Sequence, residues 1–329
     1  MRFIGRAVRA GVVLAGILAA GGAIAQGAYP SKPLRLVIPF APGGASDFVG
    51  RIMVPRWTEL LGQNIVIDNK AGASGNIGLE AAARAAADGY TLFLGNVGTI
   101  AINPNLFKTS LPIVPTRDFV AITQVVDVPS ALVAHPSFPP NNVKEMVAYL
   151  KPNPGKFNFA SPGHGSANRL EMERFMKQTG TAMVHIPYKG GAGPAIAALL
   201  AGETSVMFVT LSSAASQVRA GKLKLLAIAA PKRLAAFPNT PTLVEDGLSE
   251  MTNGSWQGVF APAGTPPEVV AKLYATTLQV METPEVRKRL ADSGVEVVTS
   301  KSPEEFAAFV ARETEKWAHV VKEAGATVD

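Results

Sequence analysis

Short apolar runs alternate with longer amphipathic segments in the first third of the chain. Apolar and β-branched residues fill 34–40, 64–68 and 90–94, which predicts three strands. Apolar residues recur at helical spacing in 46–61 and 76–87, which predicts two helices. This order of strand, helix, strand, helix, strand is typical of a parallel sheet covered by helices, so we expect an α/β fold.

A second α/β series follows a long apolar run at 119–134, which Asp127 and Pro129 interrupt. Its pattern predicts strands at 156–160, 183–188, 206–210 and 223–229 and helices at 143–150, 166–179, 194–201 and 212–220. The last part predicts strands at 256–261 and 295–298 and helices at 267–281, 284–293 and 303–324. We therefore expect two lobes, the first from 26–124 and 228–329 and the second from 125–227, joined by crossing strands.

The first 25 residues have the pattern of a secretory signal peptide. Three arginines and no acid precede an apolar run at 10–20, and small residues lead to Ala25, after which we expect cleavage. The alternative is a membrane anchor, but the run is shorter than the roughly 20 residues that span a bilayer. The chain has no cysteine, which excludes disulfides and a cysteine-linked lipid anchor.

The net charge changes once the predicted signal is removed. Three of the 31 basic residues lie in 1–25, which leaves 28 against 25 acidic residues, a net charge of +3. No block of basic residues resembles a nucleic-acid-binding surface, so we expect no nucleic-acid partner. A hydrophobic content of 47% is sufficient for buried cores to stabilise the fold. We also expect the protein to be a monomer.

Three predicted loops at strand ends are rich in glycine and small hydroxyl residues. We name them loop one (39–47), loop two (95–99) and loop three (160–166). Loops one and three lead directly into predicted helices, whose free N–H groups attract anions, and glycine lets the backbone approach a ligand. Ligands bind beyond the carboxyl ends of strands in open α/β sheets. The alternative is that Ser46, Asp47 and Ser166 only cap helices and the glycines only turn the chain.

The sequence has no complete catalytic or metal-binding motif. The glycines at 72–78 lack the spacing of a dinucleotide-binding fingerprint, and there is no phosphate loop or nucleophile elbow. The four histidines lack metal-site spacing, and only His164, in loop three, is a candidate ligand contact. Glu171 and Glu173 have the pattern of a solvated helix face, and Asp47 with Arg51 that of a local ion pair. We expect no enzyme, metal or cofactor; the alternative is a secreted hydrolase using Ser166 with His164.

The chain resembles the Bug family, the periplasmic solute receptors of tripartite tricarboxylate transporters. The matching segments follow the family order through the mature chain: 29–33, 39–44 with Asp47 and Arg51, 69–78, 87–92, 186–191, 220–223 and 261–266. The resemblance implies a two-lobed Venus-flytrap fold, with a mostly parallel sheet and flanking helices in each lobe. It also implies a periplasmic protein that binds a small organic acid between the lobes and serves the membrane permease subunits of such a transporter. A receptor that serves a membrane sensor instead has the same sequence pattern.

The resemblance also implies a set of ligand-binding residues, drawn from the three loops and from the end of one strand. Carried over by position, they are Phe40, Pro42, Gly43, Gly44, Ala45, Ser46, Asn96, Thr99, Ser161, His164, Gly165, Ser166, Lys189 and Gly190.

Two positions depart from the family pattern. Thr210 ends a predicted strand where relatives commonly have an aspartate, and Arg169 stands where a histidine is common. We include Thr210 among the binding residues. A buried ammonium group needs a counter-charge, and the Thr210 side chain has none. Thr210 therefore predicts a carboxylate ligand without an ammonium group, such as a dicarboxylate or an aromatic acid.

Overall fold

The computed structural model describes residues 29–252 and 254–323. The chain from Lys32 onward forms one compact unit. The predicted signal peptide at 1–25 lies outside the described residues. No helix in the described part of the chain has both the length and the apolar character needed to cross a membrane.

The first group of strands contains the predicted β-α-β-α-β series. Strands β1 (Leu34–Ile38), β2 (Ile65–Asn69) and β3 (Thr91–Asn96) are parallel, in the order β2-β1-β3. Strand β9 (Gly254–Pro262) lies antiparallel between β3 and the long strand β4 (Phe119–Ala134). The parallel pairing agrees with the sequence pattern, and β9 makes the sheet mixed.

Helices cover this part of the sheet. They are α2 (Ala45–Leu61), α3 (Asn76–Ala83), α10 (Pro267–Glu282), α11 (Pro284–Ala291) and α12 (Pro303–Glu323). Phe93, Phe260 and Phe306 belong to a core that joins β3 and β9 to α12. The predicted helix at 76–87 ends early, at Ala83, and the predicted strand at 295–298 is reduced to β10 (Glu296–Val297).

The second group of strands continues from β4. Strands β7 (Val206–Thr210), β5 (Asn158–Ser161) and β6 (Val184–Pro187) follow it in that order, and β8 (Lys224–Ala229) also pairs with β4. Helices α6 (Val143–Leu150), α7 (Ala167–Thr179), α8 (Ala192–Leu200) and α9 (Leu211–Arg219) cover its faces. Residues of one strand alternate between two cores: Val206 and Phe208 enter one, Met207 and Val209 the other.

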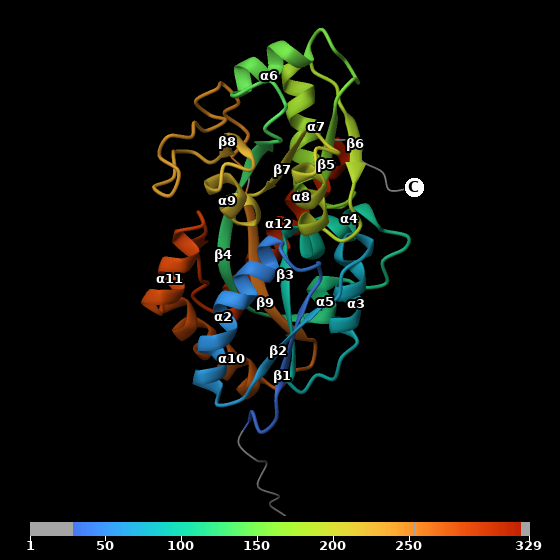
Figure 1. The fold of residues 1–329 in the computed structure, drawn as a ribbon. Helices are drawn as coiled ribbons and strands as arrows, with labels where there is room; N and C mark the ends of the chain where they lie inside the picture. The colour runs from blue at the N-terminus through green and yellow to red at the C-terminus, as the bar shows by residue number, and fades with distance from the viewer. Residues whose placement is uncertain (1–28, 253, 324–329) are drawn as a thin grey trace, which may run out of the picture. The chain divides into compact units, whose positions relative to one another are not determined.

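Strand β4 belongs to both groups (Figure 1). It pairs with β9 up to Pro129 and with β7 and β8 from Ser130 onward. The apolar run predicted to cross between lobes is therefore one continuous strand of 16 residues. The division into lobes at 124–125 and 227–228 remains a prediction.

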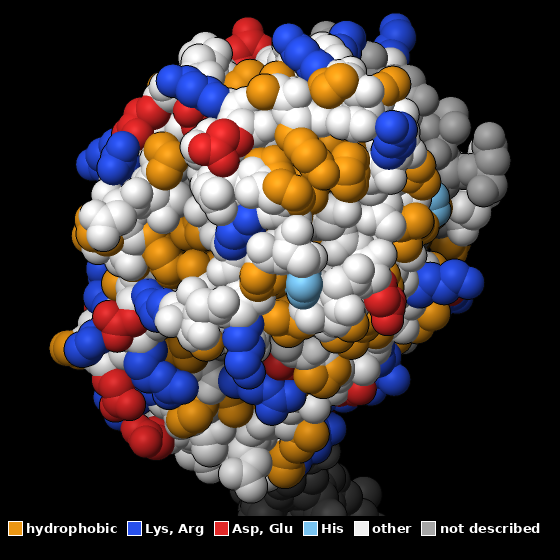
Figure 2. All heavy atoms as spheres, turned by 45° about the horizontal axis from the view of Figure 1, so that its top comes forward, with side chains coloured by type: hydrophobic (Ala, Val, Ile, Leu, Met, Phe, Trp, Pro, Cys, Tyr) orange, Lys and Arg blue, Asp and Glu red, His pale blue; other side chains and the backbone are white. Residues whose placement is uncertain are grey.

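Short helical turns also occur within the described residues. They are η1 (Ala73–Gly75), the π-helical turn η2 (Gly98–Ile102), α4 (Asn103–Leu106) and α5 (Pro115–Asp118). On the face shown in Figure 2, basic and acidic side chains are interspersed.

Candidate ligand-binding site

A cavity lies where the ends of several strands and helices meet. It contains about 560 Å³ of unfilled space, part of it open to solvent. The lining comes from both groups of strands: Phe40, Gly44, Ala45, Ser46, Ser74, Asn96, Val97, Gly98, Pro162, Gly165, Ser166, Ala167, Asn168, Ala192, Thr210 and Ser255. None of these described lining residues has a charged side chain. The cavity therefore offers hydroxyl, amide and backbone groups to a ligand.

Loop one is held in shape by Asp47. The Asp47 Oδ2 atom accepts hydrogen bonds from the Gly43 backbone N–H at 3.1 Å and from Arg51 Nε at 2.9 Å. Gly43 has a φ of 89°, which favours glycine. Asn69 Nδ2 donates to Asp47 Oδ1 at 3.2 Å and to the Phe40 carbonyl at 2.9 Å. The predicted Asp47–Arg51 ion pair is confirmed, and Asp47 also anchors the loop through Gly43 and Asn69.

The electrostatics of Asp47 follow from these contacts. Burial acts to raise its pKa, but the hydrogen bonds from Arg51, Gly43 and Asn69 and the charge of Arg51 outweigh it, so the pKa is lowered. Gly44 is the N-cap residue that precedes α2, and no side chain caps this end. The alternative role of Ser46 as a cap is therefore wrong, and the first N–H groups of α2 have no helical partner.

Loop two contributes Asn96 to the cavity but not Thr99. Thr99 is fully buried and locks the loop: its backbone N–H donates to Asn96 Oδ1 at 3.0 Å, and its Oγ1 accepts from the Asn96 N–H at 3.2 Å. Asn96 lines the cavity beside Val97 and Gly98.

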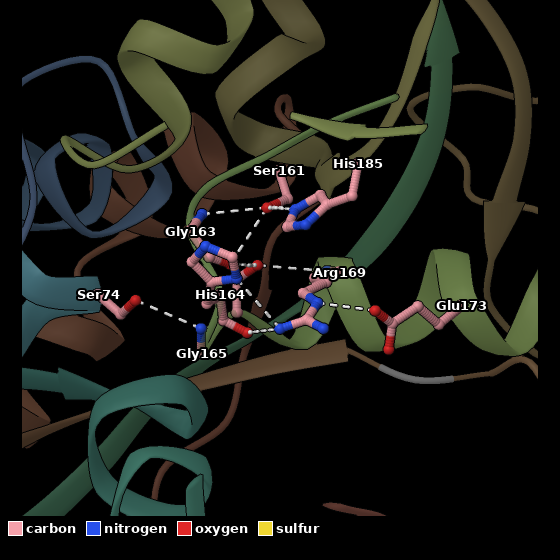
Figure 3. A network of polar contacts seen from close by, with 9 residues as sticks. Ser74, Ser161, Gly163, His164, Gly165, Arg169, Glu173 and His185 are labelled. Atoms are coloured by element: carbon pink, nitrogen blue, oxygen red, sulfur yellow. Dashed lines mark hydrogen bonds and ion pairs between the residues drawn. The ribbon is translucent and has the colours of Figure 1, made fainter. Parts of the chain in front are cut away.

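Loop three is organised by serine hydroxyls (Figure 3). Ser166 caps α7, because its Oγ accepts from the Arg169 N–H at 3.2 Å and donates to the Gly163 carbonyl at 2.9 Å. Its predicted capping role is confirmed, and Ser166 also lines the cavity. Ser161 Oγ is buried and lies 2.6 Å from His185 Nε2.

The histidines near loop three favour the neutral form. His185 packs on Phe159, and its burial, with the nearby Arg169 and His164, lowers its pKa to about 4. Burial and Arg169 also lower the pKa of His164. His164 does not line the cavity; its Nδ1 lies 3.3 Å from Arg169 Nη1. A neutral imidazole at this position provides no positive charge for an anion.

Segments from the two groups of strands touch around the cavity. The Gly165 N–H donates to Ser74 Oγ at 3.3 Å, and the Ala41 N–H donates to the Gly190 carbonyl at 3.0 Å. Gly43 lies against Gly193, where neither residue has a side chain. These contacts bring loop one to the start of α8 and loop three to η1.

The predicted binding residues divide into two sets. Those that line the cavity are Phe40, Gly44, Ala45, Ser46, Asn96, Gly165, Ser166 and Thr210. Those that lie outside the lining are Pro42, Gly43, Thr99, Ser161, His164, Lys189 and Gly190. Several of the second set support the first: Gly43 and Thr99 hold their loops, and Gly190 bonds to Ala41.

Some lining residues were not predicted. Val97, Gly98 and Pro162 lie in the predicted loops, and Ser74 lies in the Gly-rich segment 72–78. Ala167, Asn168, Ala192 and Ser255 had no sequence signal, because the contacts that bring them to the cavity are made between distant parts of the chain.

Glu171 is buried, contrary to what its sequence pattern predicts. Its side chain was expected to be solvated, but the residue is 2% exposed on the inner face of α7. Burial raises its pKa to about 7, against the hydrogen bonds from Ser130 and Asn168. Glu173, by contrast, is partly exposed and pairs with Arg169 at 2.7 Å. The acids are two positions apart on one helix and so project in different directions.

The polar groups near the cavity do not form a hydrolase site. Ser166, the nucleophile of the hydrolase alternative, uses its hydroxyl to cap α7, and no hydrogen bond joins it to His164 in the described structure. Ser161 does contact His185, but the low pKa of that histidine makes it a poor base at neutral pH. Within 29–252 and 254–323, no three His, Asp or Glu residues gather as a metal site.

Comparison with known proteins identifies close similarity over nearly the whole chain. The sequence model of one protein family, the tripartite tricarboxylate transporter family receptor, matches residues 49–326. Protein BugT of Bordetella pertussis is 36% identical over 299 residues, which cover 91% of each chain. The solved structure of the periplasmic binding protein BugD is 36% identical with a TM-score of 0.87, covering 91% of this chain and 99% of BugD.

Two similar structures contain a dicarboxylate. MatC from Rhodopseudomonas palustris, with bound malate, is 34% identical with a TM-score of 0.83, covering 89% of this chain and all (100%) of MatC. Another R. palustris protein, with adipate, is 31% identical with a TM-score of 0.87, covering 91% of this chain and 100% of that chain. The predicted fold class is confirmed: mixed sheets flanked by helices form the α/β fold of periplasmic binding proteins.

Proposed function

This chain belongs to the tripartite tricarboxylate transporter receptor family, whose members are solute-binding receptors and not enzymes, and on that premise we propose that it captures a small carboxylate for uptake. The ligand is an organic acid such as a dicarboxylate or an aromatic acid. It occupies the cavity between loops one, two and three. The partners are the membrane permease subunits of a tripartite tricarboxylate transporter.

The chemistry of the cavity lining carries this proposal. The amino-terminal ends of α2 and α7 both reach the cavity, through Gly44–Ser46 and through Ser166 and Ala167. Free N–H groups at helix starts bind carboxylates without a basic side chain. The hydroxyls of Ser46, Ser74 and Thr210 add further groups that can donate hydrogen bonds. Malate and adipate in similar structures are ligands of this chemical class.

We further propose that the chain closes around its ligand as two lobes, with boundaries at 26–124 and 228–329 for one and 125–227 for the other. The hydrogen bonds from Gly165 to Ser74 and from Ala41 to Gly190 link segments of the two proposed lobes across the cavity, which supports closure. Release of ligand requires these few contacts to open, with the crossing strands as the hinge. Transport of this kind places the receptor in the periplasm, reached through the predicted signal at 1–25.

The test is identification of the bound compound. The mature protein is purified without carboxylate buffers, and the compound released on denaturation is identified by mass spectrometry. Binding of that compound is then measured by calorimetry, and the compound is recovered and analysed again. A carboxylate recovered unchanged supports the proposal. A different chemical class overturns the ligand assignment, and conversion of the compound to a product overturns the receptor function.

A further inference from the structure

A buried group of three polar side chains lies directly behind the cavity. Ser130 is on β4, and Asn168 and Glu171 are on α7; these residues are 1%, 7% and 2% exposed. Asn168 lines the ligand cavity, whereas Glu171 borders a separate hollow between α7 and α12. Asn168 is therefore the member of the group that a ligand can touch.

The amide of Asn168 has both of its hydrogens engaged on the protein side. Its Nδ2 donates to Ser130 Oγ at 3.0 Å and to Glu171 Oε2 at 3.1 Å. An amide nitrogen has two hydrogens, and an ionised carboxylate can only accept them. Ionised Glu171 therefore fixes which end of the amide points inward. The carbonyl oxygen, Oδ1, is left for the cavity.

The charges around Glu171 do not neutralise it. On its own helix, Arg169 pairs with Glu173 and Arg174 pairs with Glu250. On α12, Lys316 pairs with Glu313 at 3.0 Å. The hollow beside Glu171 is also lined by Lys177. In the described structure no ion pair reaches Glu171, and its Oε1 has no hydrogen-bond partner.

We propose that Glu171 and Ser130 act as positioning residues that turn the Asn168 carbonyl oxygen toward the ligand, so that the cavity selects carboxylates carrying a hydroxyl group. This inference rests on the proposed function, because it names a subclass of the proposed ligands. The carboxylate of the ligand binds at the helix starts, and its hydroxyl donates to Asn168 Oδ1. An acid without that hydroxyl leaves Oδ1 without a donor.

Glu171 makes this selection depend on pH. Burial raises the pKa of Glu171 to about 7, so its protonated and ionised forms are both present near neutral pH. Above the pKa, the carboxylate accepts from Asn168 Nδ2 and holds the amide in one orientation. Below it, the acid can donate its own proton to Oδ1, which allows the amide to turn. Selection for the hydroxyl therefore strengthens as pH rises through the pKa.

The first test needs no ligand. The side-chain amide signals of Asn168 are recorded by NMR in the full mature protein at pH 8.5 and are assigned by their loss in Asn168→Asp. We expect both hydrogens to exchange slowly with water. We expect exchange to accelerate in Glu171→Gln, which can also donate a hydrogen, and in Ser130→Ala. Rapid exchange of either hydrogen in the unaltered protein overturns the proposal.

The second test measures selectivity by calorimetry with two matched pairs, malate against succinate and 2-hydroxyglutarate against glutarate. At pH 8.5 both members of each pair are fully ionised and carry equal charge, so the ratio of affinities isolates the hydroxyl; at pH 6 the affinities are compared after correction for the ionised fraction of each acid. One hydrogen bond predicts a preference of about tenfold at pH 8.5. We expect the preference for the hydroxylated acid to fall at pH 6. In Glu171→Gln, the preference should no longer depend on pH. The control is Glu315→Gln, at an exposed site on α12.

The outcomes separate the two proposals. Equal binding within both pairs at pH 8.5, or an unchanged pH dependence in Glu171→Gln, overturns the role of Asn168 and Glu171 while leaving carboxylate capture intact. If none of the four acids binds, this counts against a dicarboxylate ligand of this size and therefore against the proposed hydroxyl selection within that class. The NMR exchange rates then still decide the orientation of the Asn168 amide.

Discussion

Gly193, in the first turn of α8, packs so closely on Pro42 of loop one that a Cβ atom at Gly193 would overlap the Pro42 carbonyl oxygen. These residues lie on opposite sides of the proposed closure. We predict that Gly193→Ala weakens ligand binding by tenfold or more, because the methyl group holds the two segments apart. Calorimetry measures the affinity, and X-ray scattering measures the radius of gyration with saturating ligand. Ala197→Ser, exposed on the same helix, is the control; equal affinity in both variants would contradict the prediction.

Gly44 offers a graded test of loop one. A Cβ atom at this position meets only Ala192 Cβ at 3.8 Å and the Ala41 carbonyl at 3.9 Å, which are ordinary contacts. We predict that Gly44→Ala retains measurable binding, whereas Gly44→Val abolishes it, because the branched side chain fills the cavity beside the free N–H groups of α2. Thermal melting checks that both variants fold. Normal binding by Gly44→Val would mean that loop one is only a turn.

Asp47 is predicted to matter through loop one and not through its ion pair. Asp47→Ala removes the acceptor for Gly43, Arg51 and Asn69 together and should destabilise the fold by about 1–3 kcal/mol. Ligand affinity should fall as well. Arg51→Ala is the matched control, because Arg51 is half exposed and its loss leaves the other two hydrogen bonds. Similar losses in the two variants, by chemical denaturation, would assign the effect to the ion pair.

Glu171 should make stability depend on pH. Its pKa is about 7 in the folded protein against an ordinary value of 4.5, so between these values the folded state holds a proton that the unfolded chain releases. Stability from this group is therefore present at low pH and lost as pH rises toward 7. The loss amounts to about 3 kcal/mol.

Urea denaturation at pH 4.5 and pH 8 tests this prediction. Between pH 4.5 and pH 8, the free energy of unfolding of the unaltered protein should fall more than that of Glu171→Gln, whose side chain carries no charge at either pH. Glu315→Gln should follow the unaltered protein, because its site is exposed. Parallel pH profiles for all three proteins would show that Glu171 does not titrate between these values.

Thr210 is predicted to exclude ligands with an ammonium group. It lines the cavity, is 7% exposed and offers no negative charge, and the described cavity lining contains no acid. Calorimetry should therefore show tighter binding of succinate than of aspartate, and of glutarate than of glutamate. Thr210→Asp should gain amino-acid binding, and Thr210→Ser is the neutral control. Tighter binding of the amino acid in both pairs by the unaltered protein would rule the prediction out.

The sequence predicted elements better than it predicted which side chains meet. The alternation of strands and helices, and the long run interrupted at Asp127 and Pro129, were sufficient to predict an α/β fold with a crossing strand. Loop one could be predicted from the sequence, because its glycines and Asp47 act on the backbone next to them at the start of a helix. Glu171 was not, because its burial depends on the packing of α7 against β4. Asn168 and Ser255 reach the cavity through tertiary contacts that no local pattern encodes.

Strand β4 also has a consequence for how the protein melts. It pairs with β9 and with β7 and β8, so its loss would remove a central strand from both groups of strands at once. Neither group can unfold without breaking backbone hydrogen bonds of the other. The chain from Lys32 onward should consequently denature as a single cooperative unit, with equal calorimetric and van't Hoff enthalpies. The amides of β4 should exchange with deuterium only through global unfolding.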